Sequence, residues 1–131
     1  MGLDMFLTRK ERGEQVVEVA YWRRAWPIHD WFARKCGPCC NGVEVHPTVE
    51  QLSELLKLCE AVRPLRYHPD LEDELCFIPG AQDFYDSSFF DDAFWHKLEY
   101  TIQRLDEILE REGKRNVEGL KPFEYTYSAS W

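Results

Sequence analysis

The chain is 131 residues long, with 44% hydrophobic and 15% aromatic residues, so it holds enough apolar side chain for one globular domain spanning residues 1–131. Its 24 acidic and 16 basic side chains give a net charge of −8, which repels phosphate backbones and argues against direct binding of nucleic acid. The sequence has no run of about 18 apolar residues that could span a membrane, and its first residues lack the pattern of a signal peptide. We therefore expect a soluble cytoplasmic protein.

The N-terminal part of the chain predicts a β-hairpin followed by a helix. Apolar and polar side chains alternate over residues 3–7 and again over residues 17–21, on either side of a polar turn. A period of two is typical of strands with one buried face. Helical spacing of the apolar side chains then predicts a helix over about residues 22–35, with Pro27 either in its first turn or at a kink.

Two further helices and a C-terminal strand follow. A capping-box pattern beginning at Thr48 opens a helix over about residues 49–63. A third helix covers about residues 91–111, with acidic residues at its start and Gly113 as its stop. Apolar side chains alternate with polar ones over residues 123–131, which indicates a strand.

The sequence therefore predicts an α+β fold in which a small antiparallel sheet packs against three helices. The sheet contains the N-terminal hairpin, a short strand near residues 43–46 and the strand at 123–131. Residues 64–90 contain several prolines, so we expect a long loop there, with one short strand near residues 75–78.

Five cysteines, an odd number, are expected to be thiols, ligands or catalytic groups rather than structural disulfides in a reducing compartment. Cys36 and Cys39 form the Cys-Gly-Pro-Cys motif of thioredoxins, but here a helix precedes the motif, whereas in thioredoxins the motif opens a helix whose dipole stabilises the thiolate. We expect a tight turn without redox catalysis. An alternative is a zinc site formed by Cys36, Cys39, Cys40 and His46, although a second Cys-x-x-Cys is missing. Cys59 fits an apolar helix face and is expected in the core.

The predicted first helix combines aromatic, cationic and imidazole side chains, which could line a ligand pocket. The candidate pocket residues are Tyr21, Trp22, Trp26 and His29. Asp30 follows His29, but adjacent residues of a helix point about 100° apart and do not form an oriented acid–base pair. The alternative is that His29 is a hydrogen-bonded core residue.

Acidic and aromatic side chains interleave in the segment before the third helix. Aromatic anchors with a carboxylate rim would suit a basic surface on a protein partner. The alternative is a packed loop in which Asp91 caps the third helix. The predicted contact residues are Asp83, Phe84, Tyr85, Asp86, Phe89, Phe90 and Asp92.

Common enzyme signatures are missing from the sequence. It contains no Walker loop and no Gly-x-Gly-x-x-Gly, Gly-x-Ser-x-Gly or His-Glu-x-x-His motif. We therefore predict no catalytic residues and no required cofactor, with zinc as the alternative described above.

Several separated motifs resemble one family of small proteins. The chain reads MGLDMFL at residues 1–7, EVAYWRR at 18–24 and IHDWF at 28–32, and an aromatic segment precedes the third helix. This order is similar to a family of phage and bacterial proteins that typically begin MGLDMYL, and the resemblance covers residues 1 to about 110. The family has no established activity. What the resemblance implies is a class, since small acidic phage proteins are often inhibitors that bind host machinery, including CRISPR effectors.

The resemblance and the acidic–aromatic segment together predict an accessory protein that acts by protein–protein binding, as an inhibitor of a host defence complex such as a CRISPR effector. Its partner would be a host or phage protein with a basic surface. Two alternatives are a small enzyme or ligand-binding protein that uses the Trp22, Trp26 and His29 region, and a zinc-stabilised module. The sequence indicates no oligomeric state.

Overall fold

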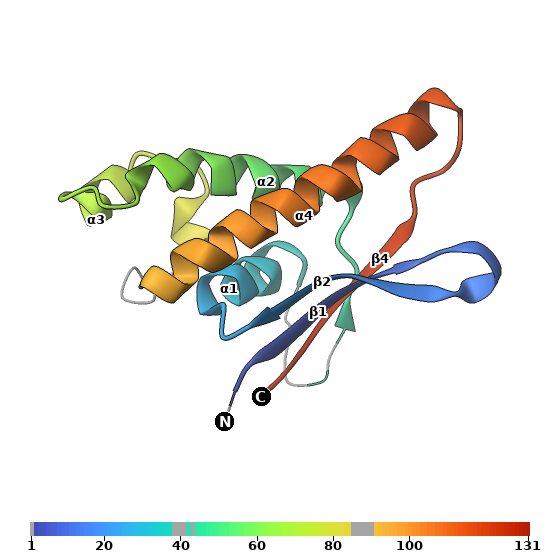
Figure 1. Ribbon diagram of the computed structural model, residues 1–131, viewed down its shortest axis with the longest axis horizontal. Coiled ribbons are helices and arrows are strands. Elements are labelled where there is room, and N and C mark those ends of the chain that lie inside the picture. The colour runs from blue at the N-terminus through green and yellow to red at the C-terminus, as the bar shows by residue number, and fades with distance from the viewer. Residues whose placement is uncertain (1, 38–41, 43, 85–90) are drawn as a thin grey trace.

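The computed structural model describes residues 2–37, 42, 44–84 and 91–131 of the chain. It has an α+β architecture, in which a four-stranded antiparallel sheet carries the main helices on one of its faces (Figure 1). In chain order the elements are β1 (Asp4–Lys10), β2 (Val16–Arg23), α1 (Trp26–Lys35), β3 (Glu44–Val45), α2 (Val49–Val62), α3 (Leu71–Leu75), α4 (Asp92–Val117) and β4 (Glu124–Ser130). Short 3-10 turns lie at Arg12–Glu14, Arg63–Leu65 and Ala81–Phe84. The predicted fold class is confirmed.

The strand order in the sheet is β2-β1-β4-β3, so the first and last strands of the chain are neighbours in the centre. β1 pairs along its whole length with β4, from Asp4 opposite Ser130 to Lys10 opposite Glu124. β3 pairs with β4 only opposite Tyr127 and Ser128. Within the described part of the chain, the first half of β4 therefore has a strand partner on one side only.

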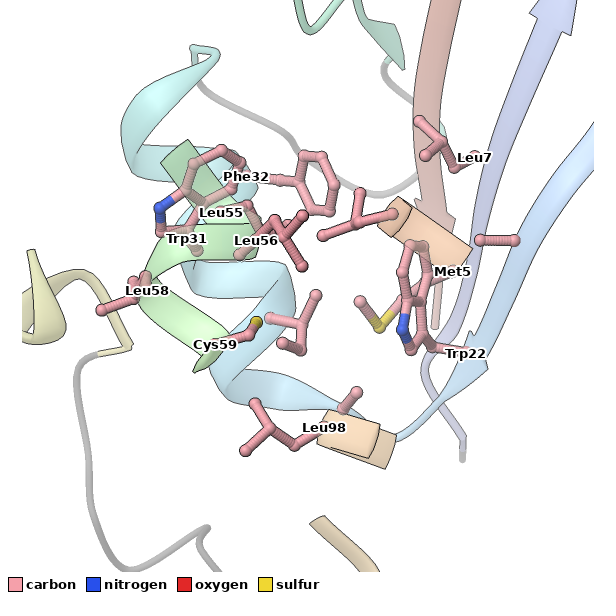
Figure 2. Close-up of a cluster of buried hydrophobic side chains, with 14 of the residues drawn as sticks. Met5, Leu7, Trp22, Trp31, Phe32, Leu55, Leu56, Leu58, Cys59 and Leu98 are labelled. Atoms are coloured by element: carbon pink, nitrogen blue, oxygen red, sulfur yellow. The ribbon is translucent and has the colours of Figure 1, made fainter. Parts of the chain in front are cut away.

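Alternating burial along the strands separates two faces of the sheet. Successive strand residues point to opposite faces, so Met5, Leu7 and Tyr127 lie against the helices while Phe6 and Thr8 lie on the uncovered face. Figure 2 shows part of the core between the sheet and the helices. Its labelled side chains are Met5, Leu7 and Trp22 of the sheet, Trp31 and Phe32 of α1, Leu55, Leu56, Leu58 and Cys59 of α2, and Leu98 of α4.

Helices α2 and α4 pack against each other through the predicted apolar stripes. The side chains involved are all buried, at 8% exposure or less: Leu52, Leu55, Leu56, Leu98, Ile102 and Leu105. The capping box of α2 is also confirmed, because Thr48 Oγ1 accepts a hydrogen bond from the Gln51 amide at 3.1 Å and Gln51 Oε1 accepts one from the Thr48 amide at 2.9 Å. None of the described helices is long and apolar enough to cross a membrane.

The predicted start of the first helix is wrong by four residues. Residue 22 belongs to β2, and α1 begins at Trp26 with Pro27 in its first turn. Pairing continues past the strand, since the Arg24 amide donates to the Leu3 carbonyl at 2.8 Å. Backbone pairing with the start of β1 therefore keeps residues 22–24 extended, although the spacing of their apolar side chains fits a helix.

Two other boundaries also differ from the prediction. The short strand expected near residues 75–78 is absent from the described chain there, which instead forms α3 at Leu71–Leu75 with acidic residues in its first turn, where the helix dipole favours them. Gly113 does not stop the third helix, because α4 runs on to Val117. The stop is Gly119, with φ of 75° and the Leu120 amide donating to the Arg115 carbonyl at 2.9 Å. This is a Schellman cap, which needs a left-handed residue.

Candidate functional site

The four residues of the predicted aromatic pocket do not come together. Tyr21 lies on the uncovered face of the sheet, where its hydroxyl donates to Asp4 Oδ1 at 2.5 Å and its ring contacts Phe6. Trp22 is the next strand residue and therefore points into the core, where its indole nitrogen donates to Thr101 Oγ1 at 2.7 Å. A pocket shared by these two side chains is not formed.

Trp26 and His29 do lie together, in an aromatic cluster at the start of α1 in which His29 is buried, Trp26 is half-buried and Trp131 is 37% exposed. The two rings are 5.9 Å apart, and the ring of Trp131 lies 5.3 Å from that of His29. His29 Nδ1 is 2.8 Å from the hydroxyl of Tyr127. Burial lowers the pKa of His29, so the imidazole is held neutral in the core. The geometry fits a hydrogen-bonded core histidine better than a solvent-facing base.

The predicted zinc ligands are only partly described. Cys39 and Cys40 lie outside the described residues. Cys36 caps the C-terminal end of α1 and donates to Gln51 Oε1 at 3.6 Å, while His46 Nδ1 lies 3.2 Å from Thr126 Oγ1. Among the residues that the structure places, no group of three histidine, cysteine or acidic side chains could hold a metal ion.

Cys59 has the predicted core position. Its side chain is fully buried on the apolar face of α2, and this burial raises the pKa of its thiol. The thiolate form is therefore disfavoured, which fits a small apolar core residue better than a ligand or nucleophile.

Most of the acidic–aromatic segment also lies outside the described residues. This applies to Tyr85, Asp86, Phe89 and Phe90, and to the side chain of Asp83. Phe84 corrects the prediction, because its ring is only 1% exposed and packs 6.2 Å from Phe94 in the core. Asp91 caps α4 by accepting from the Phe94 amide at 2.8 Å, and Asp92 is exposed in the first turn.

Several hollows in the described structure adjoin Phe123, a residue that the sequence did not single out. Phe123 lies between the end of α4 and the start of β4, and three guanidinium groups stack on its ring, at 4.8 Å for Arg9, 5.1 Å for Arg111 and 3.8 Å for Arg115. Its amide donates to the carboxylate of Glu112 at 3.1 Å. These contacts fix the ring at one end of the sheet.

Glu112 is buried although it is acidic, because it ties α4 to β4. It accepts the amide of Phe123 and the hydroxyl of Tyr125, the latter at 2.7 Å. Desolvation and the hydrogen bond to this carboxylate raise the pKa of Tyr125. Tyr125 is therefore the donor in a buried pair that holds the start of β4 in place.

A depression of about 760 Å³ lies beside Phe123, and we call it the apolar groove. Most of its wall is apolar or aromatic, and its polar lining residues are three threonines, one histidine, one lysine and two glutamates. Its lining residues are Val16, Pro47, Val49, Pro122, Phe123 and Tyr125, together with Thr8, Lys10, His46, Thr48, Glu50, Glu124 and Thr126.

The apolar groove runs along the unpaired edge of β4. The Ala129 carbonyl accepts from the Gly42 amide at 2.9 Å, so the backbone polar groups of Ala129 point toward the β3 side of the strand. In a strand, the direction of the backbone N–H and C=O groups repeats every second residue, so those of Tyr127 and Tyr125 also point toward the β3 side. Described pairing with β3 ends at Tyr127. The backbone of Tyr125 is therefore directed toward the groove without a neighbouring strand in the described chain.

A second hollow of about 480 Å³, here called the basic hollow, is also lined by Phe123. It is lined by cations from the hairpin turn and from the last turns of α4. The charged lining residues are Arg12, Arg111, Lys114 and Arg115, with Glu11 and Glu118. A third hollow of about 450 Å³ includes Phe123 and Arg115 as well, so the depressions adjoin one another. Figure 1 shows the hairpin turn and the C-terminal end of α4 toward the same end of the molecule.

Comparison with known proteins gives no match to a family model, to a curated protein or to a solved structure.

Proposed function

We propose that the protein acts by binding a protein partner, and that the apolar groove receives an extended segment of that partner. The observation that carries this proposal is the unpaired edge of β4 beside a groove of about 760 Å³. An extended peptide can add to such an edge through main-chain hydrogen bonds, while alternate side chains enter the adjoining groove. The backbone of Tyr125 would supply the first of these hydrogen bonds.

Exposed apolar side chains at the same end of the molecule support the proposal. Val16 lines the groove and is 63% exposed, and Leu120, beside the neighbouring hollow, is 48% exposed. Apolar side chains around a concave surface are typical of protein interaction sites. Binding a partner would remove them from water.

The proposed biological role is that of an accessory inhibitor of a host defence complex, such as a CRISPR effector, acting in the cytoplasm. This finer role depends on the motif resemblance over residues 1 to about 110. The net charge of −8 and the acidic–aromatic segment at residues 83–92 suit a partner with a basic surface. That segment, none of whose described residues lines the groove, would then form a second contact.

A second candidate function is the binding of a small molecule in the same groove. It is favoured by polar groups that converge on one wall, because His46 and Thr8 both contact Thr126, at 3.2 and 3.4 Å. Ligand pockets of this volume typically combine an apolar wall with a small number of oriented polar groups.

The experiment uses a pair of matched variants. Val16→Glu places a charge in the groove at an exposed position, and Val117→Glu makes the same change at a position that is 87% exposed and is not among the groove residues. Affinity purification from a bacterial host lysate with mass spectrometry identifies the partner, and calorimetry with the purified partner measures its affinity. We expect Val16→Glu to weaken binding about tenfold or more and Val117→Glu to leave it unchanged.

Hydrogen exchange and a charge variant complete the test. The amide of Tyr125 should become protected when the partner binds. Replacing Asp83, Asp86 and Asp92 with Asn should slow association and flatten its salt dependence if the acidic segment contacts a basic surface. Equal affinity of the wild type and Val16→Glu, with no new protection in β4, would rule out the groove as the contact. If a low-molecular-weight fraction of the lysate protects the Tyr125 amide from hydrogen exchange, binding of a small molecule in the groove would be favoured.

A further inference from the structure

The basic hollow concentrates positive charge in a chain whose net charge is −8. Arg12 comes from the hairpin turn, while Arg111, Lys114 and Arg115 come from the last turns of α4, about a hundred residues later in the sequence. Two acidic side chains, Glu11 and Glu118, line the same hollow. The fold therefore brings four cations and two anions together around one depression.

The cations of the basic hollow are incompletely matched by acidic groups. Arg12 forms no ion pair with any described residue. Arg115 donates to a neutral group, the Lys121 carbonyl, at 3.0 and 2.7 Å. Lys114 contacts Glu110 at 3.6 Å, but both side chains are more than 70% exposed, so water screens the pair.

Arg111 shares its acidic partner with a better-placed cation. Glu11 lies 3.5 Å from Arg111 but 2.9 Å from the buried guanidinium of Arg9. The hydrogen bond from Arg9 is the main reason that the pKa of Glu11 is lowered. An anion in the hollow could therefore engage Arg111 while Glu11 stays paired with Arg9.

We propose that the basic hollow binds a compact oxyanion with two or more negative charges, of the class of inorganic phosphates and small polycarboxylates. Guanidinium groups present paired N–H donors that match phosphate and carboxylate oxygens, and two arginines with a lysine can surround such a group. The volume of about 480 Å³ lies within the range of small-molecule sites.

The surrounding charges select a compact anion over a long polyanion. Glu107 and Glu110 are exposed on α4 before the hollow, and Glu14 is exposed on the hairpin turn. A nucleic-acid strand that entered the hollow would continue over these carboxylates and be repelled. A small oxyanion would touch only the basic residues.

The test is calorimetric titration of the full chain with sodium pyrophosphate and, separately, with sodium citrate, at low ionic strength where screening is weak. We expect binding at one site, with affinity that falls as sodium chloride is added. Arg12→Gln and Lys114→Gln should each weaken binding about fivefold or more, because each removes a charge without removing a described buried contact. Lys57→Gln, an exposed lysine of α2 that does not line the hollow, is the matched control.

Every outcome decides the proposal. Binding of pyrophosphate alone assigns the site to phosphates, and binding of both anions assigns it to compact polyanions in general. The inference is overturned if neither anion binds at millimolar concentration, or if Arg12→Gln, Lys114→Gln and Lys57→Gln all bind as the wild type does. Because no protein partner is used, failure here would leave the proposed function of the apolar groove untouched.

Discussion

The hydrogen bond between Trp22 and Thr101 gives the sharpest test of the core. The indole nitrogen of Trp22 donates to Thr101 Oγ1 at 2.7 Å, and that hydroxyl donates to the Lys97 carbonyl, also at 2.7 Å. Trp22 is 2% exposed and Thr101 is fully buried. Thr101→Val keeps the shape of the side chain but removes the acceptor, so the indole N–H is left buried without a partner.

The expected cost follows from the burial of that N–H group. An unsatisfied buried donor costs about 1–3 kcal/mol of unfolding free energy. For a chain of 131 residues, an unfolding entropy of about 2.1 cal/mol/K per residue converts this cost into a fall in Tm of roughly 4–11 °C. Thr101→Ser keeps the hydroxyl and should lose only the contribution of one methyl group, about 1 kcal/mol.

A double-mutant cycle separates the hydrogen bond from packing. Calorimetric melting and urea unfolding are measured for the wild type, Thr101→Val, Trp22→Phe and the double variant. In the Trp22→Phe background there is no indole N–H that could lose its acceptor. Thr101→Val should therefore lower the unfolding free energy there by about 1 kcal/mol or more less than it does in the wild type. An identical cost in both backgrounds would refute the reasoning.

Three further predictions concern the helices, the buried histidine and Cys36. Leu55→Ala and Leu105→Ala should each lower the unfolding free energy by about 2–5 kcal/mol through the cavity they leave, and unchanged melting curves would place the core elsewhere. His29 has a pKa below its usual 6.5, so its contribution to stability is complete above pH 6.5 and falls as the pH drops below that value. Urea unfolding at successive pH values should show this loss in the wild type and less of it in His29→Gln, and equal loss in both would contradict the assignment. Cys36 lies at the negative end of the α1 dipole, so the wild type should not catalyse insulin reduction, and turnover that disappears in Cys36→Ser would disprove this.

Periodicity predicted the elements whose pattern extends over several turns or strand residues. The stripes of α2 and α4 and the alternation of β4 are local signals, and each corresponds to one buried face in the structure. The capping box at Thr48 fixed the start of α2 within a residue for the same reason. The contact between α2 and α4 could be predicted from the same stripes, because two helices that face each other remove both apolar stripes from water.

The elements that were misplaced depend on contacts between distant residues. Spacing at Trp22 and Trp26 fits a helix, but backbone pairing with β1 extends β2 to residue 23. Gly113 resembles a helix stop, yet a glycine inside a helix costs only about 1 kcal/mol, which the packing of α4 offsets. Gly119 ends the helix because its own amide and that of Leu120 donate to carbonyls of the last turn of α4. These hydrogen bonds form only when the cap is folded, so the sequence alone does not distinguish Gly119 from Gly113.

The site around Phe123 could not be predicted, because its residues come from the hairpin turn, the start of α2, the end of α4 and the start of β4. In the sequence, Phe123 is only the first apolar residue of a strand, and the cations of α4 resemble ordinary C-terminal charges. In the structure the same ring forms part of both the apolar groove and the basic hollow. Phe123→Ala should therefore impair both binding activities, whereas Val16→Glu should affect only the partner and Arg12→Gln only the anion. If Phe123→Ala left either activity intact while the fold was retained, the ring would not form the common wall that the two hollows share here.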